Sequence, residues 1–220
     1  MRKSETLIFF IVIISFLAGI YLYPSVPQEM ASHWNINGEV DGYMAKFWGL
    51  FLMPVISAIL FLLFLMIPRI DPMSANIAKF REYFDEFVLV MFLFLFYLYF
   101  LTIVWNLGVA FSMIRFLVPA LGIVFYYAGV LIENAKRNWF IGIRTPWTMM
   151  SDNVWDKTHR IGGRLFKACG IISLYGVFVS SIAFFLVIIP VILVAIYLVA
   201  YSYFEYQKEV KSSKNPAQNL

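Results

Sequence analysis

Two segments of the chain hold most of the side chains that could bind a ligand or a partner. The first reads His33-Trp34-Asn35-Ile36-Asn37-Gly38-Glu39-Val40-Asp41-Gly42-Tyr43. The imidazole of His33 and the carboxylates of Glu39 and Asp41 form a donor set that a divalent cation can use. The same string is also rich in turn residues, because Asn-Gly and Asp-Gly dipeptides tolerate positive φ. We expect a short hairpin or folded turn here, and we assign no metal to the chain.

The second segment lies between residues 133 and 164 and combines tryptophan, histidine and basic residues. It contains Gly142-Ile143-Arg144-Thr145-Pro146-Trp147-Thr148, then Val154-Trp155 and Thr158-His159-Arg160-Ile161-Gly162-Gly163. Pro146 favours an extended Thr145, after which Ser151 or Asp152 can cap a new short helix. On that helix Trp155 and His159 share a face, because they are four residues apart. The pattern predicts an amphipathic helix on the inner membrane surface.

The alternative interpretation of this second segment is a docking surface for a partner. Arginine and tryptophan together are typical of binding hot spots, and the segment is longer than a tether between packed helices needs to be. The candidate partner-binding residues are Arg144, Thr145, Pro146, Trp147, Trp155, His159 and Arg160.

Catalytic patterns are missing from the sequence. It contains no Gly-rich phosphate loop, no paired-histidine zinc motif and no Gly-x-Ser-x-Gly elbow. The two histidines, His33 and His159, fall in loops that we expect on opposite sides of a membrane, so they cannot share a site. With Cys169 as its single cysteine, the chain can form neither an intrachain disulfide nor a thiolate metal cluster. We therefore expect neither an enzyme nor a cofactor.

The amino-acid composition indicates that the helices holding these segments lie in a lipid bilayer. Hydrophobic residues make up 62% of the 220 residues and charged residues only 14%, which is too apolar for a water-soluble domain. The net charge of +4 reflects the excess of basic residues in inner loops rather than nucleic acid binding. The chain is predicted to be an all-α multi-pass protein of the cell membrane.

Apolar runs of about 20 residues predict the membrane spans, because a helix of that length crosses the hydrocarbon core. Five apolar runs are evident, of which the fourth is interrupted by Arg115, and the last is long enough to be divided near Ser180 and Ser181. The six predicted spans are Thr6 to Tyr23, Phe47 to Ile67, Phe87 to Leu107, Phe111 to Ile132, Leu165 to Ser181 and Ile182 to Phe204. Arg115 lies just inside the fourth span, where its side chain can snorkel to the outer headgroups.

Basic residues fix the predicted orientation, with both termini in the cytoplasm. Six spans leave only Lys46 and Arg115 near the outer side, as expected when Lys and Arg collect in cytoplasmic loops. The alternative is one tilted helix kinked at Pro190, which gives five spans and an outer C-terminus. That arrangement moves the tail lysines outside, so six spans are favoured.

The inner string from Gly142 to Thr148, with Val154-Trp155 and Thr158 to Gly163, closely resembles the SdpI family of membrane proteins. The outer string from His33 to Gly42 resembles the module of unknown function that precedes the SdpI region in longer members. The resemblance implies a module over residues 1–68 with spans one and two and an SdpI-like region over residues 69–211. Its outer-loop motif residues are His33, Asn35, Gly38, Glu39, Asp41 and Gly42. Residues 212–220 are polar, and we expect them to form a disordered tail.

The resemblance to the SdpI family also implies a function and partners. They are immunity to a secreted peptide toxin outside the cell and recruitment of a winged-helix repressor inside it. The alternative is a transporter of small solutes or ions, because Pro54, Pro119 and Pro190 could mark broken helices. No acidic residue stands at mid-depth in a span to carry protons, which favours the immunity protein. The sequence leaves the oligomeric state open.

Overall fold

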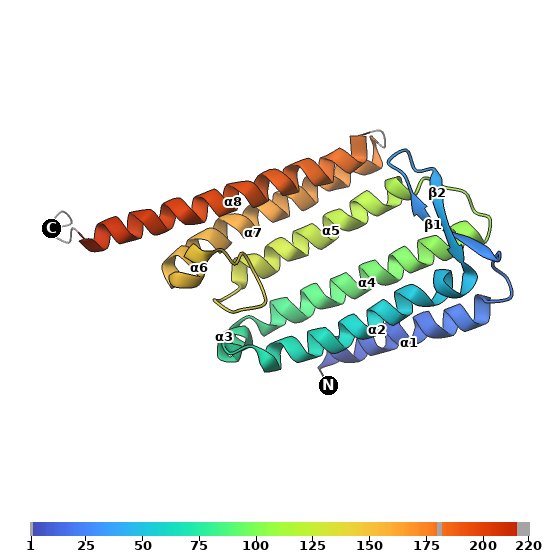
Figure 1. Ribbon diagram of the computed structural model, residues 1–220, viewed down its shortest axis with the longest axis horizontal. Helices are drawn as coiled ribbons and strands as arrows, with labels where there is room; N and C mark the ends of the chain where they lie inside the picture. The colour runs from blue at the N-terminus through green and yellow to red at the C-terminus, as the bar shows by residue number, and fades with distance from the viewer. Residues whose placement is uncertain (1, 180–181, 215–220) are drawn as a thin grey trace.

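The computed structural model describes residues 2–179 and 182–214, and long helices dominate them. Six of the described helices have 20 or more residues, and they run back and forth along the molecule (Figure 1). They are α1 (Lys3–Leu22), α2 (Lys46–Ile70), α4 (Arg81–Asn106), α5 (Met113–Asn134), α7 (Asp152–Leu174) and α8 (Ala183–Lys214). The shorter elements are α3 (Ser74–Lys79), α6 (Pro146–Met150), the 3-10 turn η1 (Tyr175–Val177), and the strands β1 (Glu29–Trp34) and β2 (Val40–Ala45).

Within the described residues, five helices are long and apolar enough to cross a membrane: α1, α2, α4, α5 and α8. The predicted split at Ser180 and Ser181 lies outside the described residues. On either side of it the tract folds as two helices, α7 and α8, which lie side by side (Figure 1) and contact each other. A single helix kinked at Pro190 is therefore excluded, and Pro190 lies inside α8.

Helix α7 differs from the sequence prediction. A short amphipathic helix and a separate fifth span were expected, but Asp152–Leu174 is one continuous helix. Its first half carries charged residues, so it falls short of the apolarity of the other five. The face with Trp155, His159, Gly162 and Gly163 is buried against the rest of the protein. The prediction of two separate elements was wrong, because tertiary packing holds the polar half and the apolar half in one helix.

Glycines bring α5 and α7 into close contact. A Cβ atom added to Gly129 would lie 2.6 Å from the carbonyl oxygen of Gly163, and one added to Gly170 would lie 2.5 Å from that of Gly122. In each helix the two glycines are seven residues apart, so they face the same side. The absence of side chains lets the backbones approach, as is common between helices in membranes.

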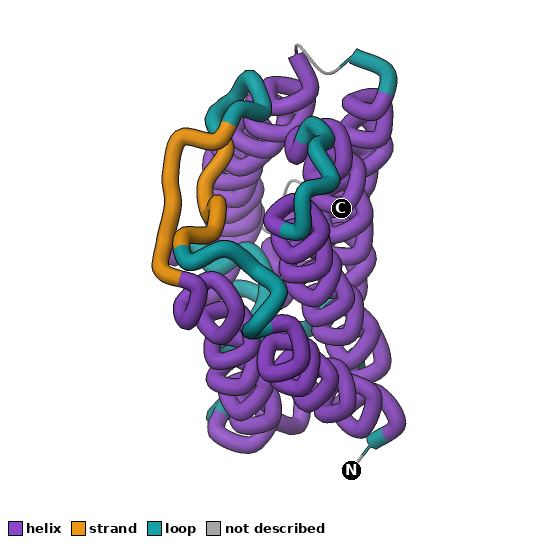
Figure 2. The backbone as a smooth tube through the Cα atoms, turned by 90° about the vertical axis from the view of Figure 1, so that its right-hand side faces the viewer, coloured by secondary structure: helices purple, strands orange, loops and turns teal. Residues whose placement is uncertain are grey.

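The hairpin predicted between residues 24 and 46 is confirmed. Strands β1 and β2 pair antiparallel, with Glu29 opposite Ala45 and Trp34 opposite Val40. Gly38 adopts φ of 81° in the turn, a conformation that side chains disfavour. Figure 2, viewed from the hairpin end, shows the strands lying across one side of the helix ends. Helix α1 begins, and helix α8 ends, on the side away from the hairpin (Figure 1).

The C-terminal tail is helical further than expected. Helix α8 continues to Lys214, so residues 212–214 are not the start of a disordered segment. The rest of the predicted tail lies outside the described residues.

Candidate functional site

The inner loop, residues 135–151, connects α5 to α7 and has little regular structure, yet its backbone is fixed by buried side chains. Asn138 is fully buried, and its amide makes four hydrogen bonds. The nitrogen donates to the carbonyls of Lys136 (2.8 Å) and Ile141 (2.9 Å). The oxygen accepts from the backbone N–H groups of Phe140 (2.9 Å) and Ile141 (2.6 Å). The side chain of Asn138 therefore provides hydrogen-bond partners for backbone groups that would otherwise be paired within a helix or a sheet.

His159 and Trp155 clamp the next part of the loop from α7. Their rings stack with centroids 3.8 Å apart. The indole N–H of Trp155 donates to the carbonyl of Ala135 at 2.8 Å, and Nε2 of His159 accepts from the backbone N–H of Ile143 at 2.9 Å. Gly142 passes over the imidazole with φ of 111°, and a Cβ there would lie 2.4 Å from Nε2. Only glycine fits this close approach.

The hydrogen bonds of His159 define its protonation state. Because Nε2 accepts a bond, the proton is assigned to Nδ1, which donates to the carbonyl of Trp155 at 2.8 Å. Burial lowers the pKa of His159 to about 4, although the hydrogen bond to the carbonyl of Trp155 alone would raise that pKa. The imidazole is neutral at physiological pH, so it acts as a structural acceptor rather than as a charge.

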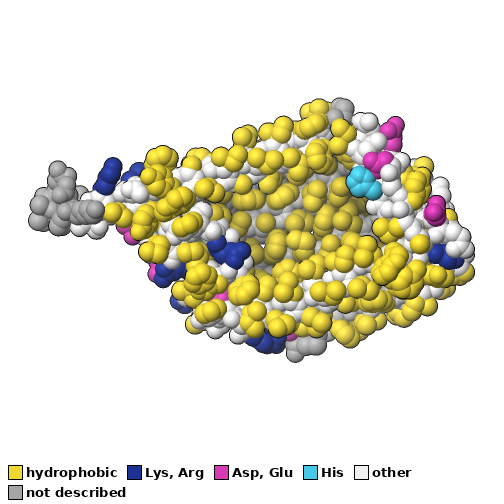
Figure 3. Space-filling view, in the orientation of Figure 1, with side chains coloured by type: hydrophobic (Ala, Val, Ile, Leu, Met, Phe, Trp, Pro, Cys, Tyr) yellow, Lys and Arg dark blue, Asp and Glu magenta, His cyan; other side chains and the backbone are white. Residues whose placement is uncertain are grey.

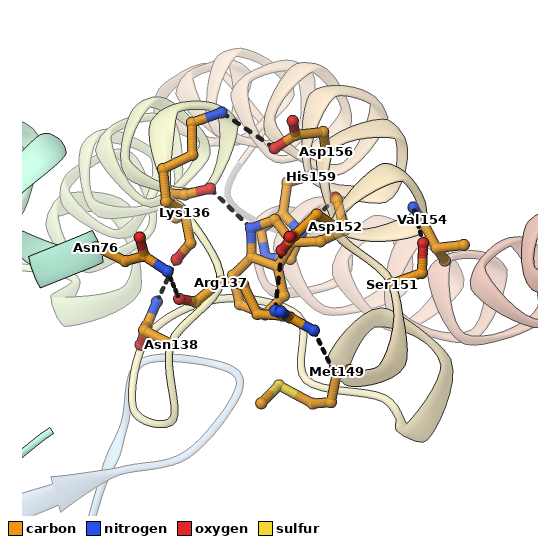
Figure 4. Close-up of polar contacts among 12 residues, drawn as sticks. Asn76, Lys136, Arg137, Asn138, Met149, Ser151, Asp152, Val154, Asp156 and His159 are labelled. Carbon is orange, nitrogen blue, oxygen red and sulfur yellow. Dashed lines mark hydrogen bonds and ion pairs between the residues drawn. The ribbon is translucent and has the colours of Figure 1, made fainter. Parts of the chain in front are cut away.

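A second set of contacts ties the loop to the connection between α2 and α3. Asp71, only 3% exposed, accepts from the backbone N–H groups of Met73 (2.6 Å) and Trp139 (2.9 Å). Asn76 donates to the carbonyl of Arg137 at 2.8 Å (Figure 4). These bonds join segments more than 60 residues apart in the sequence, so the loop is part of a folded inner end.

Arg137 joins the beginning of the loop to its end (Figure 4). Its guanidinium donates to the carbonyl of Met149 at 2.9 Å and pairs with Asp152, at the start of α7, at 2.9 Å. Lys136 pairs with Asp156 one turn later at 3.1 Å. The two basic residues that follow α5 therefore hold the beginning of α7 beside the end of α5.

Helix α8 supports the loop through buried hydroxyl groups. Thr145 caps α6 by accepting from the backbone N–H of Thr148 at 3.2 Å, and its hydroxyl lies 2.9 Å from that of Ser202 on α8. Ser151 caps α7 as predicted, accepting from the N–H of Val154 at 3.2 Å. The same hydroxyl donates to Glu209 on α8 at 2.8 Å.

The predicted partner-binding residues thus fall into two groups. Thr145, Trp155 and His159 are buried and hold the loop from inside, and Trp147 is half-buried with its ring 5.1 Å from that of Tyr203. Arg144, Pro146 and Arg160 are exposed.

The exposed part of the loop includes two aromatic residues that are not among the predicted partner-binding residues. Trp139 is 54% exposed and Phe140 is 40% exposed. The guanidinium of Arg144 donates to the backbone carbonyl of Trp139, which precedes Phe140 in the chain, so these three exposed residues lie close together on the loop. We call Trp139, Phe140 and Arg144 the loop face. It combines aromatic rings and a cation on a fixed backbone.

The outer-loop motif is brought together by the hairpin. Asn35 accepts from the N–H groups of Asn37 (2.9 Å) and Glu39 (3.1 Å), and its amide donates to the Glu39 carboxylate at 3.0 Å. His33 pairs with Asp41 across the strands, and Gly42 lies directly against His33. Among the described residues, no group of three or more His, Cys, Asp or Glu side chains could hold a metal ion. His33, Glu39 and Asp41 shape the turn in separate pairs.

Several residues of the site were missed, most of them because their partners are distant in the sequence and Asn138 because its burial is not evident from the sequence. Asp71, Asn138 and Arg137 make their contacts inside the inner end. Asn106 clamps the hairpin to α4, accepting from the N–H of Ala31 at 2.8 Å and donating to its carbonyl at 3.0 Å. A polar residue at the end of an apolar run was the available signal in the case of Asn106 and Asp71.

Comparisons with known proteins match both the region of the inner loop and the region of the hairpin. The model of the SdpI/YfhL protein family matches residues 134–202, which include the inner loop, α7 and most of α8. A domain of unknown function, DUF1648, matches residues 10–58, which include the hairpin. The immunity protein SdpI of Bacillus subtilis (strain 168) is 26% identical over 212 residues, covering 96% of this chain and 100% of the relative. No solved structure matches the chain.

Proposed function

Because the chain carries the SdpI/YfhL family region behind a DUF1648 module, we propose that it is a membrane immunity protein that protects its cell from a secreted peptide toxin. The full-length similarity to an immunity protein supports this proposal. The proposal divides the chain into an N-terminal module, residues 1–68, and an SdpI-like region, residues 69–211.

The proposal includes six membrane crossings with both termini in the cytoplasm. Five helices have the composition of spans, and α7 lies among them as the sixth long helix of the bundle. Helix α7 crosses the bilayer together with the turn η1 that follows it, while its first, polar turns lie at the inner surface beside the loop. The basic residues of the inner loop are then cytoplasmic, in accord with the positive-inside rule.

The proposal further assigns the loop face to a cytoplasmic partner on which protection depends, a winged-helix repressor that is held at the membrane. One observation carries this assignment: buried Asn138, Asp71 and His159 fix a loop whose aromatic and basic side chains remain outside. A loop that only connected α5 to α7 would not need buried polar side chains to fix its backbone. A rigid surface with Trp and Arg loses little entropy on binding, which is how hot spots reach high affinity.

Survival of toxin-sensitive cells tests the immunity proposal. Cells that express the chain should survive exposure to the secreted peptide of a producer strain, and cells with an empty vector should die. A matched variant, Asn138→Leu, should reduce survival because it removes four loop hydrogen bonds, each worth about 1 kcal/mol. Equal killing of cells with and without the wild-type chain, at confirmed membrane abundance, would contradict the proposal for that toxin.

A further inference from the structure

A groove of about 530 Å³ opens between α4 and α5 in the half of the bundle nearer the hairpin. Figure 3 shows this region as a hollow covered by hydrophobic side chains. Its walls include Val90, Leu93 and Phe94 from α4 and Phe116, Pro119 and Ile123 from α5. The volume falls in the range of roughly 300–1,000 Å³ that is usual for ligand sites.

Polar groups occur at one end of the groove. Arg115, in the first turn of α5, is exposed and lines the groove, and within residues 2–179 and 182–214 its guanidinium has neither an ion pair nor a hydrogen bond. Tyr97 lies nearby, with its hydroxyl 3.5 Å from the carbonyl of Phe116. Ser112 precedes α5 without capping it through its side chain, so the positive end of the helix dipole is not neutralised there. This end of the groove favours an anion.

We propose that the groove binds an anionic phospholipid, with one acyl chain along the apolar wall and the phosphate paired with Arg115. The arrangement matches the two parts of such a molecule: an apolar tail in hydrocarbon and a negative headgroup at the hairpin end of the bundle. Arginine suits this role because its guanidinium forms two parallel hydrogen bonds with phosphate oxygens. Arg115 lies in the first turn of α5, where its side chain can reach the headgroup layer and pair with a lipid phosphate.

The lining argues for a lipid over an extended peptide. A peptide strand carries one N–H and one carbonyl per residue, and each costs several kcal/mol when it is left unpaired in hydrocarbon. Below Arg115 and Tyr97 the groove offers only hydrocarbon side chains. An acyl chain has no such groups to satisfy. The inference does not depend on toxin immunity, because it follows from the lining and the charge alone.

Lipid binding to the full-length protein, measured by native mass spectrometry, tests the role of Arg115. The probes are phosphatidylglycerol and phosphatidylcholine with identical acyl chains. The wild type should bind phosphatidylglycerol about tenfold more tightly. Arg115→Gln should remove that preference, since losing a charge-assisted pair costs about tenfold in affinity. Arg115→Lys should retain part of it.

The matched control is Lys46→Gln, which removes a cation from the same end of the bundle, where Lys46 lies 4.5 Å from the ring centre of Tyr23. This variant should keep the preference for phosphatidylglycerol. If Lys46→Gln and Arg115→Gln weaken binding equally, the charge effect is diffuse and the proposed site is wrong.

A second arm tests the groove itself by filling it. Ala120→Trp, or Ile123→Trp if the first variant does not fold, should reduce phosphatidylglycerol binding at least tenfold, because both residues line the groove. Ala195→Trp, on an exposed position of α8, should leave it unchanged. Unchanged lipid binding in the groove variants would overturn the proposal. If those variants instead lose only toxin protection, the groove is a peptide site and the lipid proposal is also wrong.

Discussion

At the residue scale, His159 decides whether the inner loop can form, because it is the acceptor for the backbone N–H of Ile143. A protonated imidazole has no acceptor at Nε2 and would be buried with its charge. The neutral form is therefore part of the folded state, and its proton equilibrium contributes to stability.

The first prediction is that stability falls in acid through this residue. Since the pKa of His159 is about 4 in the folded protein and 6.5 when exposed, the unfolded chain binds more protons between these values. The stabilising contribution is complete above pH 6.5 and is lost as pH falls through 4. Its size is on the order of 3 kcal/mol.

Melting temperatures of purified wild type and His159→Gln, measured between pH 7.5 and 4.5, test this prediction. The variant should be less stable at pH 7.5 and should lose less stability on acidification than the wild type. Parallel pH profiles for the two proteins would show that His159 does not carry the effect.

Individual residues also show how far the sequence could be interpreted. The turn at Asn37 and Gly38 and the cap at Ser151 were predictable, because each depends on neighbours within a few residues. Asp71 and Asn138 were not singled out, since Asp71 bonds to Trp139 68 positions away and the burial of Asn138 is invisible in sequence. Trp155 and His159 were recognised, but they are buried and position the loop rather than form its surface.

At the scale of elements, the contact between α5 and α7 holds the inner loop in place, because these two helices form its beginning and its end. A Cβ atom added to either Gly129 or Gly170 would overlap backbone atoms of the other helix, and backbone atoms cannot move aside as a flexible side chain can. Added methyl groups must push the helices apart.

The second prediction concerns these glycines. Gly129→Ala and Gly170→Ala should each destabilise the protein by about 1–3 kcal/mol, the usual cost of overpacking. Ala195→Val, on an exposed face of α8, is the matched control and should change stability little. Thermal unfolding in detergent measures the difference. Wild-type stability of both glycine variants would mean that the helices are not in close contact.

The boundaries of α1, α2 and α5 were predicted within three residues, because hydrocarbon thickness sets the length of an apolar run. Helix α4 begins six residues before its predicted span and α8 ends ten residues after its own, since both helices continue into polar sequence beyond the apolar run. Helix α7 was harder to predict, since its first half has charges and Gly162-Gly163 in place of an apolar pattern. Its continuity depends on α5 and α8, which pack against it. Sequence periodicity does not contain that information.

At the scale of the whole molecule, the hairpin and the inner loop lie at opposite ends of the bundle, as Figure 1 shows. A bilayer around the helices would separate them into two compartments. The third prediction follows from the proposed orientation and uses cysteine labelling in a Cys169→Ala background.

In that background, Asn37→Cys on the hairpin should react with an impermeant maleimide on intact cells. Asn153→Cys, near the start of α7, should react only after permeabilisation. Both positions are exposed, so labelling reports the compartment rather than burial. Labelling of both cysteines from outside would contradict the six-span orientation.

The loop face is the central claim of the functional account, and a double variant, Trp139→Ala with Arg144→Gln, tests it. Both side chains are exposed, so the variant should keep wild-type membrane abundance and melting temperature. The matched control is Lys211→Gln, which removes an exposed charge from the end of α8.

The most direct measurement is survival of toxin-exposed cells that carry each variant at equal membrane abundance. The loop-face double variant should lose protection, because truncating hot-spot residues costs about 2 kcal/mol or more each, while Lys211→Gln should protect as well as the wild type. Full protection by the double variant would contradict the claim that the inner loop carries the function.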